Sequence, residues 1–130
     1  MSGTSPRVLV VDDEPLITQA LCEALEPLGC QPTAAFNGRQ ALEAVEKQVP
    51  DLIVLDVTMP LMDGFQTLEW LRTNPSTRNT PVIMLTALSS DADMLRGLRG
   101  GATMYLTKPI DVVKFRALIT AILGPRLRPR

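Results

Sequence analysis

The chain has 130 residues, of which 45% are hydrophobic and 21% are charged. This length provides for one domain with a single core, and the composition is typical of a globular protein in water. The 13 basic and 14 acidic residues nearly cancel, so no global field attracts nucleic acid or an anionic membrane surface. No apolar stretch approaches the roughly 20 residues that span a bilayer. The N-terminal residues lack the apolar region of a signal peptide, and we therefore expect a cytoplasmic protein.

The chain has no histidine and only two cysteines, Cys22 and Cys30. The absence of histidine removes Ser-His-Asp triads, imidazole bases and most zinc sites. The cysteines lack Cys-x-x-Cys spacing, so we interpret them as reduced packing residues rather than a redox pair or half of a metal site. Any chemistry must therefore use carboxylates, hydroxyls, lysine or a bound metal.

Strand-like apolar runs alternate with amphipathic helical segments five times along the chain. The first strand is predicted at 7–12, and Pro15 suits the first turn of the following helix, which ends at Gly29. A weaker second strand is predicted at 31–36, and Asn37 is expected to cap the next helix. The inward positions of that second helix are expected to be Ala41, Leu42, Val45 and Val49.

The pattern continues after Pro50, which ends the second helix because the residue before a proline is disfavoured in the helical region. The third strand is predicted at 52–55 and is followed by a helix at about 64–73. The fourth strand is predicted at 81–85 and leads to a helix near 90–99.

A short last strand at 104–106 precedes a final helix, which Asp111 is expected to cap. Such alternation implies parallel pairing through right-handed crossovers. The fold is therefore predicted as α/β: a flavodoxin-like, doubly wound three-layer sandwich with a five-stranded parallel sheet and five helices. We place this domain at residues 7–123, with residues 1–6 as a disordered N-terminus and residues 124–130 as a disordered tail or the start of a linker.

Charged side chains follow three of the predicted strands. Asp56 ends the third strand, the pair Asp12 and Asp13 follows the first, and Lys108 follows the last. Each has a structural interpretation on its own, because the aspartates suit helix caps or turns and a lysine is ordinarily a solvated charge. The carboxyl ends of parallel strands form the edge where ligands bind. The joint placement of all four residues at this edge favours a functional site.

Four motifs occur in order: Val-Asp-Asp-Glu at 11–14, Leu-Asp-Val-Thr-Met-Pro with Met-Asp-Gly at 55–64, Leu-Thr-Ala at 85–87, and Tyr-Leu-Thr-Lys-Pro at 105–109. With these motifs the chain resembles, over residues 7–123, the receiver domain of two-component response regulators. The resemblance implies a sheet of order 2-1-3-4-5. It also implies a phosphoryl donor, either a sensor histidine kinase or a histidine phosphotransfer protein.

The resemblance implies a role for each residue of the predicted site. Asp56 matches the phosphoacceptor, whose carboxylate becomes an acyl phosphate. Asp12, Asp13, Asp56 and the backbone carbonyl of Thr58 match the ligands of one Mg2+, a hard cation that prefers oxygen. Asp13 is expected to bind the metal directly and Asp12 through a water. Lys108 matches the lysine that pairs with the phosphoryl oxygens.

The resemblance also implies a conformational switch that transmits the presence of the phosphoryl group to another surface of the domain. Thr86 matches the switch hydroxyl and Tyr105 the coupled aromatic, although a strand-end threonine and a packed tyrosine are the ordinary interpretations of each alone. Pro109 matches a proline preceded by a cis peptide. At Ala87 a side chain larger than methyl would crowd the phosphoryl group.

The expected function is therefore a phosphorylation-controlled switch in a phosphorelay, rather than a conventional multiple-turnover enzyme. The face formed by the fourth helix, fifth strand and fifth helix would control a partner or output domain, and homodimerisation on phosphorylation remains open. We expect no direct binding to nucleic acid and no membrane. One alternative is a receiver-like interaction module that never takes phosphate. The other is a haloacid-dehalogenase-type phosphatase, which needs a second aspartate where Thr58 stands.

Some positions depart from the family pattern. Thr103 and Met104 stand where many receivers have an acidic pair, which puts charged dimer contacts of that type in doubt. Thr58 and Leu88 flank the path of the water that would hydrolyse the acyl phosphate. Leu88 has no polar group to orient this water, so slow self-dephosphorylation is predicted. A basic cluster marks either a partner face or a solvated helix surface. This cluster consists of Arg96, Arg99, Lys114 and Arg116.

Overall fold

The computed structural model describes residues 5–57, 63–87, 95–96 and 98–127. One five-stranded sheet of order β2-β1-β3-β4-β5 runs through the molecule, and each neighbouring pair of strands is parallel. The predicted strand order is confirmed. The strands are β1 (Arg7–Val11), β2 (Gln31–Ala35), β3 (Leu52–Asp56), β4 (Val82–Thr86) and β5 (Met104–Thr107).

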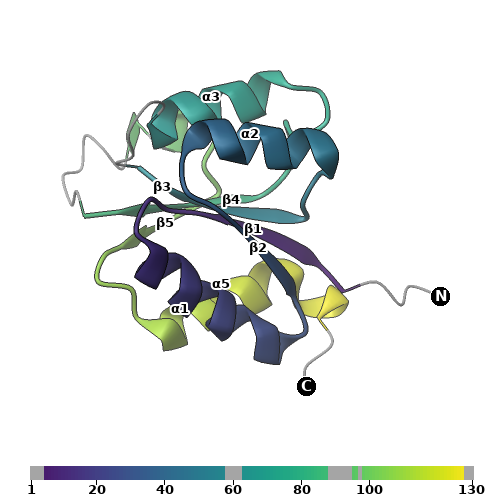
Figure 1. Cartoon of the computed structure of the whole chain (residues 1–130), viewed down its shortest axis with the longest axis vertical. Helices are drawn as coiled ribbons and strands as arrows, with labels where there is room; N and C mark the ends of the chain where they lie inside the picture. The colour runs from purple at the N-terminus through teal and green to yellow at the C-terminus, as the bar shows by residue number, and fades with distance from the viewer. Residues whose placement is uncertain (1–4, 58–62, 88–94, 97, 128–130) are drawn as a thin grey trace.

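Helices cover both faces of the sheet, with α2 and α3 on one side and α1 and α5 on the other (Figure 1). The three-layer α/β prediction is thus confirmed. Four α-helices have bounds within the described part of the chain, against five predicted. Residues 95, 96, 98 and 99 are also helical, while the rest of the helix predicted near 90–99 lies outside the described residues. The bounds are α1 (Pro15–Leu25), α2 (Gly38–Lys47), α3 (Gly64–Thr73) and α5 (Val112–Leu123), with 3-10 turns η1 (Glu26–Leu28) and η2 (Gly124–Arg126).

The core consists of two clusters, one on each face of the sheet. Successive side chains of a strand point to opposite faces. Val8 and Val10 therefore pack among α1 and α5, whereas Leu9 and Val11 pack among α2 and α3. All residues of β3 and β4 are buried, as expected for central strands covered on both faces. No helix in the described residues is both long and apolar enough to cross a membrane.

Side-chain caps fix where three helices begin. The Oδ1 atom of Asn37 accepts a hydrogen bond from the Gln40 amide at 2.8 Å at the start of α2. Asp111 accepts from two amides of the first turn of α5. Asp63 and Gln66 form a reciprocal capping box at α3, which satisfies two amides that a helix start otherwise leaves unpaired. The capping predicted for Asn37 and Asp111 is confirmed.

The prediction that Val49 points inward from the second helix is wrong. Helix α2 ends at Lys47, and Gln48 is extended with φ −160°. Val49 therefore lies two residues beyond the end of the helix, and its side chain is 41% exposed.

Contacts of the described residues extend past both predicted domain ends. Pro6 is buried, and its carbonyl accepts a hydrogen bond from the Gln31 amide at 2.8 Å. After α5, Leu127 packs into the α1 and α5 cluster and is 9% exposed. Arg126 forms an ion pair with Asp51 at 2.8 Å. An apolar contact and an ion pair thus join to the domain the start of a segment that we predicted to be a disordered tail or the start of a linker.

Candidate functional site

The register of the sheet brings the predicted site residues to one edge. Val11, the last residue of β1, is paired with Leu55. Asp12, directly after β1, and Asp56, the last residue of β3, therefore lie beside each other. Asp56 is in turn paired with Leu85. Thr86 is paired with Thr107, the residue before Lys108. Parallel pairing alone therefore gathers groups that lie far apart in the sequence.

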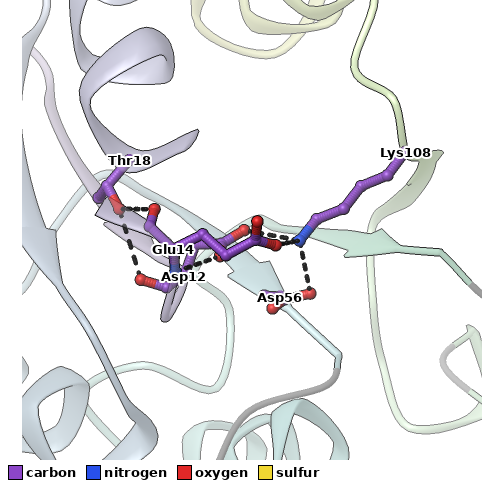
Figure 2. A network of polar contacts seen from close by, with 5 residues as sticks. All are labelled: Asp12, Glu14, Thr18, Asp56 and Lys108. Carbon is purple, nitrogen blue, oxygen red and sulfur yellow. Dashed lines mark hydrogen bonds and ion pairs between the residues drawn. The ribbon is translucent and has the colours of Figure 1, made fainter. Parts of the chain in front are cut away.

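Lys108 lies at the centre of the charged groups. Its Nζ atom lies 2.9 Å from Asp12 Oδ2, 3.4 Å from Asp56 Oδ1 and 3.4 Å from Glu14 Oε1. Figure 2 shows the lysine reaching across the strand ends towards the three carboxylates. The Asp12 and Asp56 side chains are 0% and 3% exposed, whereas Glu14 is 60% exposed. The peptide bond between Lys108 and Pro109 is cis.

The two carboxylate oxygens of Asp12 serve different purposes. Oδ1 accepts a hydrogen bond from the Glu14 amide at 2.9 Å and so holds the loop between β1 and α1. Oδ2 is buried and, within the described residues, accepts no hydrogen bond. Its contact with Lys108 is an ion pair without hydrogen-bond geometry. One buried oxygen is therefore left with capacity for a further positive ligand.

The N-cap residue of α1 is Glu14, not Asp12 or Asp13. Its side chain makes no capping hydrogen bond, which leaves the carboxylate available to reach Lys108. Thr18 Oγ1 instead lies 2.8 Å from the Glu14 carbonyl oxygen and 3.4 Å from that of Asp12 (Figure 2). This buried hydroxyl ties the first turn of the helix to the loop that carries the acidic residues.

Three carboxylates converge at the strand ends. Asp12, Asp13 and Asp56 each offer one oxygen, and these oxygens lie within 4.8 Å of one another. Like charges at such distances repel one another. The donor set is all oxygen, which is the set that a hard divalent cation prefers. The described residues thus fit a site for such a cation.

Opposing effects act on the pKa of Lys108. Burial lowers the pKa of this ammonium group, but the close contact with Asp12 and the negative charges of Asp56 and Asp12 outweigh burial and raise it above the ordinary value. Lys108 therefore remains a cation at neutral pH and offsets part of the negative charge around it.

Gly64 is required by its closeness to the backbone of Asp56. A Cβ atom at this position would collide with the Asp56 carbonyl oxygen and lie 2.7 Å from Val57 Cα. The Gly64 amide also donates to the Val57 carbonyl at 2.8 Å. The first turn of α3 is therefore packed directly on the end of β3, and any larger residue would displace it.

Thr86 and Tyr105 lie on the same face of the sheet. Met84 belongs to the α2 and α3 cluster, and Tyr105 packs against that cluster. Thr86 is two residues after Met84 in β4, so its side chain points to the same face. Tyr105 is the register partner of Met84. Thr86 is fully buried, and its carbonyl accepts a hydrogen bond from the Lys108 amide at 2.7 Å.

An open cleft lies over the charged groups. Its volume is about 340 Å³. Ala87 contributes only a methyl group to its wall, which leaves room beside Asp56. The residues that line the cleft are Asp13, Glu14, Asp56, Ala87 and Lys108.

Sequence reasoning did not assign Glu14 to the site. The structure places its carboxylate 3.4 Å from Lys108 Nζ. The available signal was its position directly after the acidic pair and before Pro15, which begins the helix. The metal role predicted for the Thr58 carbonyl and the position of Leu88 lie outside the described residues.

The family model for the response regulator receiver domain matches residues 8–120. The chain belongs to this family. Within it, a DNA-binding dual master transcriptional regulator, RpaA of Synechocystis sp., is 39% identical over 118 residues, which cover 91% of this chain and 49% of RpaA. The receiver domain therefore spans about half the length of this relative.

Solved structures agree with this assignment. Chemotaxis protein CheY4 of Vibrio cholerae has a TM-score of 0.87 and 32% identity, covering 92% of this chain and 100% of that one. The receiver domain of sensor histidine kinase PA1611 from Pseudomonas aeruginosa PAO1 has a TM-score of 0.84 and 28% identity, covering 93% of this chain and 99% of that one. The PA1611 structure holds a magnesium ion coordinated in its active-site cleft.

Proposed function

We propose that this receiver domain accepts a phosphoryl group on Asp56. The observation that carries the proposal is the position of this carboxylate, buried at the end of β3 yet on the wall of an open cleft, 3.4 Å from a lysine ammonium. A carboxylate oxygen in this setting can reach a phosphorus atom in the cleft. The nearby cation then faces the charge that the phosphoryl group brings.

Transfer of the phosphoryl group from the donor histidine to Asp56 needs no further reagent. A carboxylate oxygen of Asp56 forms a new bond to phosphorus while the bond between phosphorus and the donor histidine nitrogen breaks. The imidazole carries a proton on its other ring nitrogen, so it leaves with the electron pair as a neutral group, and the product is an acyl phosphate. Lys108 donates hydrogen bonds to the phosphoryl oxygens as a compact point charge. The donor is a sensor histidine kinase or a histidine phosphotransfer protein.

Mg2+ is the proposed cofactor, held by Asp12, Asp13, Asp56 and the backbone carbonyl of Thr58. The buried Asp12 oxygen without a hydrogen bond and the converging carboxylates support this assignment. So does the magnesium ion in the PA1611 receiver domain. When bound, the metal offsets charge on the carboxylates and on the transferring group.

The switch proceeds from Thr86 to Tyr105. In this proposal the Thr86 hydroxyl turns to donate to the phosphoryl group, and Tyr105 moves into the space that it leaves. Their shared sheet face supports such coupling. The surface made by residues 95, 96, 98 and 99, β5 and α5 then changes its affinity for a target or output domain. Residues 7–123 form the receiver unit, against which η2 and Leu127 pack.

Acetyl phosphate with Mg2+ provides the test, with intact mass as the readout. We expect the wild-type protein to gain one phosphoryl group per chain and Asp56→Asn to gain none. Slow loss of the label is expected because Leu88 cannot orient water; loss within seconds would contradict that part. No gain in the wild type would indicate an interaction module instead. Sustained turnover of a small phosphoester would indicate an enzyme.

A further inference from the structure

Two helices of the fold begin with the same buried threonine contact. Thr18 is the fourth residue of α1, and Thr67 is the fourth residue of α3. Each hydroxyl donates to the carbonyl of the N-cap residue, at 2.8 Å to Glu14 and at 2.9 Å to Asp63. Both threonines are buried, and a threonine in a helix commonly donates to the carbonyl four residues earlier. The start of the helix therefore explains this bond at both positions.

Thr18 differs from Thr67 because its hydroxyl has a second acceptor, the carbonyl oxygen of Asp12 at 3.4 Å. Thr67 has one acceptor among the described residues. Asp12 and Asp13 belong to the loop between β1 and α1 and carry two of the three converging carboxylates. The Thr18 hydroxyl thus reaches from the helix into the loop that carries proposed metal ligands (Figure 2).

The peptide groups on both sides of Asp13 are held by hydrogen bonds. The group before it contains the Asp12 carbonyl, which the Thr18 hydroxyl contacts. The group after it contains the Glu14 amide, which donates to Asp12 Oδ1 at 2.9 Å. Because a peptide group is planar, a hydrogen bond to one of its atoms restricts the rotation of the whole group. The two contacts together limit the directions that the Asp13 side chain can take.

Asp13 depends on this support because it is exposed, so packing contributes little to its direction. Its carboxylate nevertheless offers one of the three oxygens that lie within 4.8 Å of one another. A ligand that is already oriented loses less conformational freedom when an ion binds. Hydrogen-bond partners behind metal ligands act in this way, and their loss weakens metal binding.

We propose that the Thr18 hydroxyl is a positioning group for the divalent cation: it orients the peptide group before Asp13 so that this carboxylate points towards the site before the ion binds. This inference rests on the proposed function, because it adds a residue to the proposed Mg2+ site. Thr18 touches neither the ion nor the phosphoryl group and acts through the loop. Thr67 has the same bond at the start of α3 but no such role.

Thr18→Val and Thr67→Val are a matched pair for the test, because each removes a buried hydroxyl and nearly keeps the size of the side chain. Both helix starts keep their backbone bonds. The Glu14 carbonyl retains two amide donors at 3.1 Å, and the Asp63 carbonyl retains one at 3.0 Å. We therefore expect similar falls in the thermal midpoint, of about 4 °C, when unfolding is measured in a chelator.

Mg2+ affinity should separate the two valine variants. We expect titration calorimetry to show about tenfold weaker binding in Thr18→Val, the lower end of the effect of losing a partner behind a metal ligand. Thr67→Val should bind like the wild type. Thr18→Ala lacks the hydroxyl as well and should show the same loss, whereas Thr18→Ser retains the hydroxyl and should recover most of the affinity.

Phosphorylation provides a second readout. Asp56 and Lys108 are unchanged in Thr18→Val, so saturating Mg2+ should compensate for the weaker site. We expect this variant to gain one phosphoryl group per chain from acetyl phosphate at high Mg2+, and to need more Mg2+ than the wild type or Thr67→Val to reach half of the maximal rate.

Several outcomes overturn the proposal. Wild-type affinity in Thr18→Val would leave Thr18 as a residue of the helix start, like Thr67. Equal losses of affinity in the two valine variants, or no recovery in Thr18→Ser, would also overturn it. A wild-type protein that binds no Mg2+ or gains no phosphoryl group overturns the proposed function too. A wild type that does both, beside a Thr18→Val variant with unchanged affinity, overturns this inference alone.

Discussion

One aspartate lies directly before strand β3 and another lies at its end, and the two have different surroundings. Asp51, before the strand, has a donor for each oxygen: Oδ2 accepts from the Arg7 amide at 2.8 Å, and Oδ1 pairs with Arg126 at 2.8 Å. Asp56, at the end of the strand, is 3% exposed and lies 3.4 Å from Lys108, a cation that it shares with Asp12 and Glu14.

The difference shows that the two ends of β3 have different roles, one structural and one in binding. At the amino end of β3, one carboxylate with matched donors contacts both the start of β1 and the segment that follows α5. At the carboxyl end, carboxylates outnumber the cation between them, and their repulsion is relieved when a metal or another positive group binds. The first arrangement stabilises the protein as it stands. The second gives up stability for a site that binds.

Removing the cation at each end should produce the largest contrast. Lys108→Met leaves Asp12 buried without its counter-charge, and we expect it to lower the free energy of unfolding by about 3 kcal/mol without metal. Arg126→Met breaks a half-exposed pair and should cost about 1 kcal/mol or less. Urea unfolding in a chelator measures both, and Mg2+ should restore part of the first loss. Equal losses at the two ends would contradict the comparison.

Metal binding should distinguish the two ends next. Asp13→Asn removes one of the converging oxygens, and we expect Mg2+ affinity to fall by about 10- to 100-fold. The same variant should be slightly more stable than wild type without metal, because one repelling charge is gone. Asp51→Asn is the matched control and should bind Mg2+ like wild type. Titration calorimetry decides, and unchanged affinity in Asp13→Asn would remove that residue from the metal site.

Alkaline pH provides a third contrast. The folded pKa of Lys108 lies above its ordinary value of 10.5, so its contribution to stability is full below that pH and is lost as pH rises through the folded pKa. The stability difference between wild type and Lys108→Met should therefore be constant from neutral pH to about 10 and shrink above it. Lys47→Met, at an exposed position on α2, should show no such trend. Unfolding measured in a chelator across this range provides the check.

The smallest expected effect concerns Glu14. Its exposed carboxylate competes for Lys108 and adds negative charge where an anionic donor approaches. Glu14→Gln should accelerate phosphorylation by acetyl phosphate about two- to fivefold. Glu43→Gln removes an equally exposed charge on α2 and should leave the rate unchanged. A slower reaction in Glu14→Gln would instead mean that the carboxylate holds Lys108 in a productive position.

The carboxyl end could be predicted from sequence because a parallel sheet places the ends of its strands together. The runs before Asp12, Asp56 and Lys108 were sufficient to predict the charged cluster. Glu14 could not be predicted, because whether its side chain caps α1 or turns towards Lys108 depends on contacts across the sheet. The predicted five-helix count was not reached among the described residues.

The amino end was harder to predict because its contacts join distant parts of the chain. Arg126 and Leu127 lie in a segment whose composition is typical of a linker, yet they meet Asp51 and the apolar core. Val49 fits a helical period but lies beyond the end of α2. The Asn37 cap fixes the start of α2, but a periodic pattern cannot report where the helix stops when no glycine or other C-cap signal marks its end.

Asp51 and Asp56 lie in one tryptic peptide, between Lys47 and Arg72, and this permits a direct test of the central claim. Borohydride reduces an acyl phosphate to an alcohol, so it converts a phosphorylated aspartate into homoserine and leaves free carboxylates intact. After reaction with acetyl phosphate and Mg2+, fragment masses of this peptide should place homoserine at position 56. Homoserine at position 51 or at another carboxylate, or an unmodified peptide from a phosphorylated protein, would contradict the account.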